Sequence, residues 1–144
     1  MDENKVEQLR KWLRLCPNLQ KSSAFRVNYL GAEEVEYALT QVPSLIRYRR
    51  NVLGEEEPLS TQTEQFSLQL RLPYGKDIQE NMRCTAWCQQ ILEWIIAQCQ
   101  PQRYPEFRDG RVLSIVPTLS PYVAQAGQGT AVYEIMLQVT YERY

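Results

Sequence analysis

The sequence predicts an α+β fold, in which an N-terminal helix and one long helix pack on a largely antiparallel or mixed β-sheet. Two patterns lead to this prediction. Apolar and polar side chains alternate over residues 64–72, as in a half-buried strand. Over residues 77–100 the apolar side chains instead recur every three or four residues, as in an amphipathic helix. Runs of strands placed between helices are typical of the α+β class.

The N-terminal part of the chain is expected to hold one helix and two short strands. The helix runs from Glu3 to Cys16, because apolar residues recur there at helical spacing, and Pro17 ends it. Residues 25–29 alternate between apolar and polar side chains and predict the first strand. Residues 37–42 are the second candidate strand, and a proline follows them.

Residues 45–60 are the hardest stretch to assign, because many of their side chains are charged. Ile46, Tyr48 and residues 51–53 are candidates for a strand. A glycine and a proline predict a loop around the three glutamates at 55–57.

The long helix should follow the strand at 64–72. Asp77 is a suitable N-cap, and a helix from there to Gln100 would span about 36 Å. Two further strands are predicted at 111–116 and 132–141, because both stretches are rich in apolar and β-branched residues.

Residues 117–131 connect these last two strands. Ordinary hairpin loops have about 2–5 residues, so a connection of this length predicts a projecting hairpin arm with a glycine-containing tip. We hypothesise that the arm contacts a neighbouring subunit or the tail tube. The domain organisation predicted is a single α+β domain, 1–144, with this arm.

The composition excludes several classes of function. The chain has 144 residues, 16 Lys+Arg, 17 Asp+Glu, no histidine and a net charge of −1. Near-zero charge argues against a nucleic-acid binder that neutralises many phosphates. The absence of histidine removes the commonest general base and every histidine-containing metal site. We expect no signal peptide, no membrane segment and folding in the cytosol.

The cysteines do not indicate a metal or redox site, because no pair has the CxxC spacing. We expect them to be buried, reduced thiols. No catalytic, metal-binding or cofactor-binding residue is therefore nominated, and the protein is predicted not to be an enzyme. The four cysteines are Cys16, Cys84, Cys88 and Cys99.

Two clusters are candidates for subunit or tube contacts. The first joins basic and acidic residues close in sequence, which suits a solvated or subunit-bridging surface better than nucleic-acid binding. It consists of Arg47, Tyr48, Arg49, Arg50, Glu55, Glu56 and Glu57. The second lies in the expected hairpin arm and centres on Tyr122, because tyrosine is enriched at interfaces. It consists of Pro121, Tyr122, Val123 and Ala124.

Several stretches, in chain order, resemble a family of short tail proteins from bacteriophages and prophages of Gram-positive bacteria. Members are described as minor capsid, tail-completion or tail-terminator-like proteins. The most specific stretch is VLSIVPTLSPYVAQAGQGTAVYEIMLQVTYER at 112–143. The others are LRKWLRLCPNL at 9–19, FRVNYLG at 25–31, EYALTQVPS at 36–44 and RYRRNVLGEEEPL at 47–59. One departure is the absence of a proline near Glu34.

This resemblance implies a structural role and a tail-terminator-like fold. Tail terminators form a ring, usually a hexamer, that stops growth of the tail tube and joins it to the head connector. The implied partners are other copies of the chain, the tail tube protein and the head-tail connector protein. The implied location is the tail or neck of the virion, assembled in the host cytoplasm. The alternatives are another neck or head-completion component, a small enzyme of unknown reaction, or a nucleic-acid-binding module that uses residues 47–50.

Overall fold

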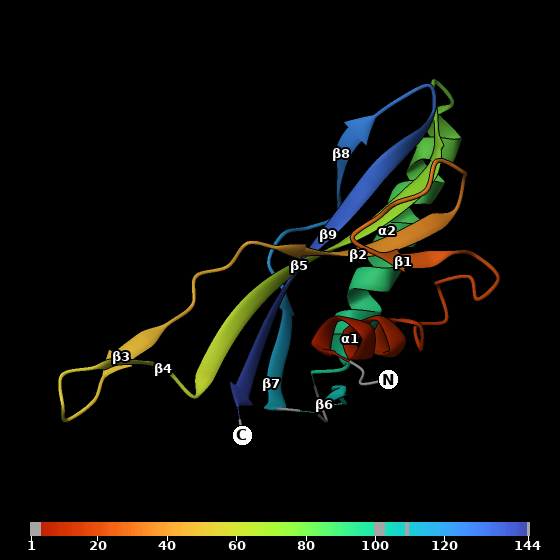
Figure 1. Cartoon of the computed structure of the whole chain (residues 1–144). Coiled ribbons are helices and arrows are strands. Elements are labelled where there is room, and N and C mark those ends of the chain that lie inside the picture. Colours follow the sequence, from red (N-terminus) through yellow and green to blue (C-terminus); the bar gives the residue numbers. More distant parts are fainter. Residues whose placement is uncertain (1–3, 100–102, 109, 144) are drawn as a thin grey trace.

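The protein has an α+β architecture in which two helices cover one face of a mixed, mostly antiparallel sheet (Figure 1). The computed structural model describes residues 4–99, 103–108 and 110–143. The helices are α1 (Lys5–Leu13) and α2 (Ile78–Ala97). The strands are β1 (Phe25–Val27), β2 (Glu36–Val42), β3 (Tyr48–Arg50), β4 (Glu56–Pro58), β5 (Thr61–Tyr74), β6 (Glu106–Phe107), β7 (Gly110–Pro117), β8 (Tyr122–Ala126) and β9 (Gly129–Arg143).

The main sheet is built around its two longest strands. Its order is β1-β2-β5-β9-β7-β6, and every neighbouring pair is antiparallel except β1 and β2. β5 and β9 pair in register from Thr61↔Glu142 to Tyr74↔Gly129. On the other edge of β9, β8 pairs along 131–134 and β7 along 137–143. The other strands of the main sheet therefore attach to the β5–β9 ladder, either directly or through β2 and β7.

The core lies between the helices and one face of this sheet. Alternate residues of β5 and β9 point toward the helices and are buried, which confirms the predicted alternation. The helices contribute apolar side chains to the same cluster. The largest fully buried side chains are Leu9, Leu13, Tyr37, Leu39, Phe66, Leu68, Leu70, Leu72, Ile91, Ile95, Ile115 and Ile135.

Both helices begin at the side chain of a capping residue. Asp77 accepts hydrogen bonds from the backbone of α2's first turn, as predicted, and Asn4 does so for α1. α1 ends at Leu13 and not at Cys16, because the chain tightens into three-residue turns before Pro17. Cys16 is nonetheless buried. The expected first residue of this helix, Glu3, and the expected end of the long helix, Gln100, lie outside the described residues.

The other face of the sheet carries polar side chains that bond to one another across the strands. Thr63 and Thr140 are 3.2 Å apart between their hydroxyl oxygens. Gln69 donates to Glu134 at 3.0 Å and accepts from Thr40 at 3.2 Å. Such cross-strand pairs stabilise a sheet that no helix covers on this side. In the described part of the chain, no helix is long and apolar enough to cross a membrane.

The region between β2 and β5 differs from its expected structure. Residues 51–53, a candidate strand, form a turn, and the glutamates at 56–57 lie in β4 and not in a loop. Pairing with β3 forms β4 despite the poor intrinsic strand preference of glutamate and proline. β6 was not expected either, and it is held by its pairing with β7.

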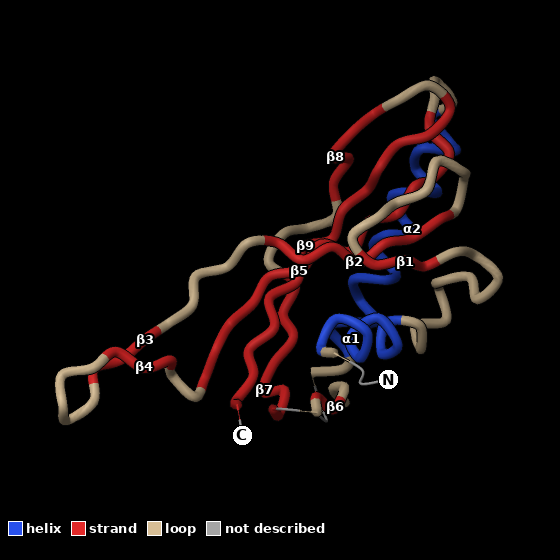
Figure 2. The backbone as a smooth tube through the Cα atoms, viewed as in Figure 1, coloured by secondary structure: helices blue, strands red, loops and turns tan. Residues whose placement is uncertain are grey.

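The segment at 117–131 forms a hairpin that lies within the sheet. β8 folds back on β9, and the glycine at 129 pairs with Tyr74 at the end of β5. The tip therefore ends level with the neighbouring strand. The hairpin that extends away from the sheet is formed by β3 and β4 (Figure 2).

Candidate interaction surface

Residues 45–60 form an arm that extends away from the main sheet (Figures 1 and 2). Its strands β3 and β4 pair with each other and with no strand of the main sheet. Both strands are exposed except for partial cover of Glu57. An isolated two-stranded hairpin is marginally stable at best in water. Cover from a binding partner would therefore stabilise the arm.

The tip of the arm is a turn held by local hydrogen bonds. Gly54 donates its backbone N–H to the carbonyl of Asn51 at 3.0 Å, which closes a four-residue turn. The Asn51 side chain accepts from the backbone of Leu53 at 2.9 Å and of Glu55 at 3.0 Å. Gly54 has a φ of +81°, a conformation that glycine adopts without strain. The turn is thus specified by asparagine and glycine alone.

The two corner positions of this turn hold apolar residues. Val52 is fully exposed and Leu53 is 78% exposed. Neither residue type is required by the turn, since asparagine and glycine define it. At the base of the arm, Leu45 and Ile46 are also exposed. Exposed apolar side chains gathered on one projecting element indicate a contact surface.

The arm brings together the first predicted contact cluster. Arg49 lies opposite Glu57 and forms an ion pair with it at 2.8 Å, whereas Arg50 lies opposite Glu56. The cluster also contains Arg47, Tyr48 and Glu55, and all its members except Glu57 are exposed. The charges of the arm are therefore balanced, and most of its ionic groups face solvent.

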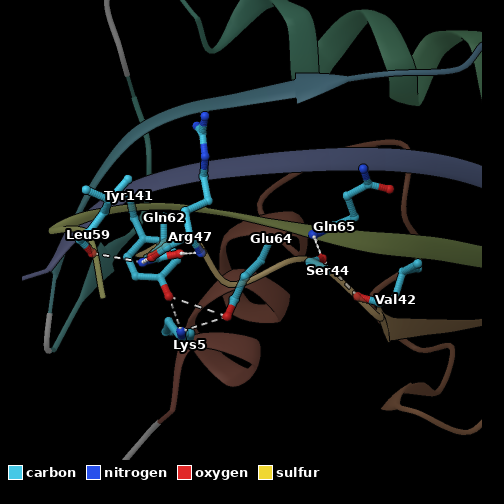
Figure 3. Close-up of polar contacts among 9 residues, drawn as sticks. All are labelled: Lys5, Val42, Ser44, Arg47, Leu59, Gln62, Glu64, Gln65 and Tyr141. Carbon is cyan, nitrogen blue, oxygen red and sulfur yellow. Dashed lines mark hydrogen bonds and ion pairs between the residues drawn. The ribbon is translucent and has the colours of Figure 1, made fainter. Parts of the chain in front are cut away.

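The root of the arm is fixed by Gln62, a buried polar residue of β5 (Figure 3). Its side-chain oxygen accepts the backbone N–H of Arg47 at 3.1 Å. Its amide nitrogen donates to the carbonyl oxygens of Arg47 at 2.9 Å and Leu59 at 2.8 Å. One side chain thus binds both legs of the arm and sets the direction in which the arm leaves the sheet.

Ser44 extends the β2–β5 pairing toward the arm. Its hydroxyl accepts the backbone N–H of Gln65 at 2.8 Å and donates to the carbonyl of Val42 at 3.1 Å (Figure 3). The proline at 43 cannot donate a ladder hydrogen bond, so a side chain supplies a bond near the end of the ladder.

A groove of about 740 Å³ lies beside the root of the arm. Its walls include Leu45 and Ile46 of the arm and the Lys5, Glu64 and Tyr141 group of the sheet and α1. The Lys5 ammonium donates to the Tyr141 hydroxyl at 2.7 Å and to Glu64 at 3.1 Å (Figure 3). Burial lowers the pKa of Lys5, but these two hydrogen bonds and the charge of Glu64 outweigh it, so the pKa is raised.

The second predicted contact cluster lies elsewhere. Tyr122, Val123 and Ala124 belong to β8, all five residues of which are exposed. The Tyr122 hydroxyl donates to Glu134 of β9 at 2.5 Å, and this bond raises the pKa of Tyr122. The arm's root meets β9 at the other end, where the backbone N–H of Arg143 donates to Ser60. The Tyr122 contact and the root of the arm are thus about 30 Å apart along β9.

Residues outside the two predicted contact clusters complete this surface. They are the apolar side chains Leu45, Ile46, Val52 and Leu53 and the clamp residue Gln62. An asparagine and a glycine three residues apart, with two apolar residues between them, could have indicated an exposed apolar turn. Nothing in the local sequence distinguishes Gln62 from the other glutamines of β5.

The buried cysteine thiols do not supply a reactive nucleophile to this surface. Burial raises the pKa of Cys88 to about 12 and also raises the pKa values of Cys16 and Cys84. These thiols are neutral at physiological pH and therefore weak nucleophiles. Within 4–99, 103–108 and 110–143, no three histidine, cysteine or acidic residues are grouped as a metal site would need.

Comparison with known proteins leaves the family undetermined. No profile of a known protein family matches the chain, and a search of curated proteins gives no significant match. The candidate site therefore rests on the geometry described above.

Proposed function

We propose that this protein is a structural subunit of a phage virion, which assembles into a ring that caps the tail tube and joins it to the head. The observation that carries the proposal is the arm, which displays Val52 and Leu53 at its tip. A contact between unlike surfaces of identical subunits closes into a ring when the rotation permits. The sequence resemblance to tail-terminator-like proteins supports the same role.

The arm is suited to binding and not to folding of its own chain. Its tip contributes nothing to the buried core, and Gln62 fixes its direction before any partner binds. A preorganised element loses little conformational freedom on association. The second contact surface in this proposal is β8, whose free edge is uncharged and exposed. The tail tube or the head connector would bind there.

The proposal is tested by deleting the gene in a phage that carries it. Loss of a tail terminator is expected to leave tails of uncontrolled length that are not joined to heads, which electron microscopy would reveal. Supplying the wild-type chain from a plasmid should restore joined tails of uniform length. Virions of normal length and infectivity without the protein would refute the proposal.

The oligomeric state gives a second measurement. Six chains of 16.9 kDa would give a ring of about 101 kDa. Light scattering after size exclusion, on the free protein and on protein released from purified tails, measures this mass. Attachment to heads that lack tails, and not to finished tails, would favour another neck component.

A further inference from the structure

The chain exposes two separate pairs of apolar side chains on the arm. Val52 and Leu53 lie at the tip, and Leu45 and Ile46 lie at the root, where they line the groove beside the sheet. Leu45 is 89% exposed and Leu53 is 78% exposed. Burying either pair would release about 25 cal/mol for each Å² of apolar surface removed from water.

The tip cannot reach the groove of its own chain. Val52 is seven positions after Leu45, and in an extended leg this separation spans about 23 Å. The arm points away from the sheet, and Gln62 holds both legs in that direction. Any tip that fills the groove must therefore come from another molecule.

The charges of the tip and the groove are complementary. Glu55 follows the turn and has no ion-pair partner within the described residues. Arg143 lines the groove and is likewise unpaired there, whereas Lys5 is already paired with Glu64. A tip placed in the groove could bring the carboxylate of Glu55 to the guanidinium of Arg143. Charge pairs of this kind fix the register of an interface.

We propose that the arm's tip binds in the root groove of a second copy of this chain. This inference rests on the proposed function and adds the two surfaces that meet. Val52 and Leu53 of one copy cover Leu45 and Ile46 of the next, and Glu55 pairs with Arg143. Each copy has one tip and one groove, so the same contact can join each copy to the next. In every such contact both apolar pairs are covered. It is a heterologous contact, which can close into a ring.

Cross-linking between two singly labelled proteins tests this contact. In a Cys99→Ser background, one protein carries Val52→Cys and the other carries Gln41→Cys in the groove wall. The remaining native thiols are buried and neutral. Equal amounts are mixed and treated with a short bismaleimide. We expect a covalent dimer that contains both proteins, as shown by mass spectrometry.

A matched control uses an exposed apolar pair far from the groove lining, Ile78 and Met82 on α2. The Val52→Cys protein is mixed with an Ile78→Cys protein and treated in the same way. A dimer in this mixture and none with Gln41→Cys would overturn the proposal. Absence of cross-links in both mixtures would also overturn it, while defective tails on gene deletion would still support the proposed function.

Charge reversal gives an independent measurement on the same pair. Glu55→Arg and Arg143→Glu should each weaken self-association about fivefold, the effect of roughly one exposed ion pair. The double variant should recover most of the affinity, because the pair is restored with opposite polarity. Arg83→Glu, on α2, changes the net charge by the same amount as Arg143→Glu and should have no effect. Additive losses in the double variant would contradict pairing of these two groups.

Discussion

The two hairpins of this protein are similar in length, but one is part of the main sheet and the other projects from it. The β8–β9 hairpin lies in the sheet, and Tyr122 bonds to Glu134 on the strand beside it. The β3–β4 hairpin pairs with nothing but itself and displays Val52 and Leu53 in its turn. The first hairpin uses its residues to extend the fold. The second keeps its apolar residues out of the fold and leaves them available to a partner.

This difference implies that stability and assembly depend on separate parts of the chain. Removal of the β8–β9 hairpin takes away strand pairs of the main sheet, whereas removal of the arm takes away none. Variants in either hairpin can therefore be used to test the separation.

Deletions should separate the two hairpins most clearly. Replacing residues 48–58 with a short glycine-containing turn keeps the Arg47 and Leu59 partners of Gln62, so it should abolish self-association and leave the thermal midpoint almost unchanged. Deleting residues 123–129 should lower the free energy of unfolding by about 1–4 kcal/mol, the sum of several cross-strand pairs. Light scattering measures the first effect and denaturant unfolding the second. An arm deletion that unfolds the protein would contradict the separation.

Gln62→Ala should leave the arm in the chain but remove the hydrogen bonds that hold its direction. The substitution leaves backbone groups of Arg47 and Leu59 without their partner, at a cost of about 1–3 kcal/mol. Hydrogen exchange of arm amides should become faster, and self-association should weaken. Gln138→Ala, on the polar face of β9, is the control, and it should leave arm exchange unchanged. Equal effects from both variants would show that Gln62 does not hold the root.

Tyr122→Phe should weaken the β8–β9 hairpin by about 1 kcal/mol and leave the arm unaffected. The folded-state pKa of Tyr122 is raised above 10.0, its ordinary value. Its hydrogen bond therefore stabilises the protein below pH 10 and is lost as the pH rises through the folded-state pKa. The difference in stability between wild type and variant should shrink above pH 10. A difference that is constant across this range would exclude the Tyr122 hydroxyl as its source.

Arg49→Ala should have the smallest effect, about 0.2–0.5 kcal/mol on opening of the arm, because its ion pair with Glu57 is exposed. A double-mutant cycle with Glu57→Ala, followed by hydrogen exchange of the arm, measures this coupling. A coupling several times larger would mean that ion pairs, and not Gln62, maintain the arm.

The sequence predicted elements whose side chains follow one period over many residues. β5, β9 and α2 are of this kind, because each packs one continuous face on the core. β4 was missed, since its glutamates and proline form a strand only when β3 lies beside them. The sequence predicts a projecting arm in place of β8, because the prolines before it and the glycines after it are typical of a loop.

The candidate site was predicted in part. The charged residues of the arm were singled out because opposite charges close in sequence are visible without a structure. The direction of the arm depends on Gln62, whose side chain binds Leu59, three residues away, and Arg47, fifteen residues away along the chain. The exposure of Val52 and Leu53 depends on the arm's leaving the sheet. Local composition indicates at most that Val52 and Leu53 lie in a turn, and it does not indicate the direction of the arm.

The long ladder between β5 and β9 has a mechanical consequence. The arm continues directly into the first residues of β5. β5 is paired with β9 over a length of about 46 Å. The hydrogen bonds of this ladder run perpendicular to the strands. A pull on the arm along the strand axis therefore loads these bonds together in shear and does not open them one after another. A subunit held by its arm would thus resist tension in the direction in which its longest strands run.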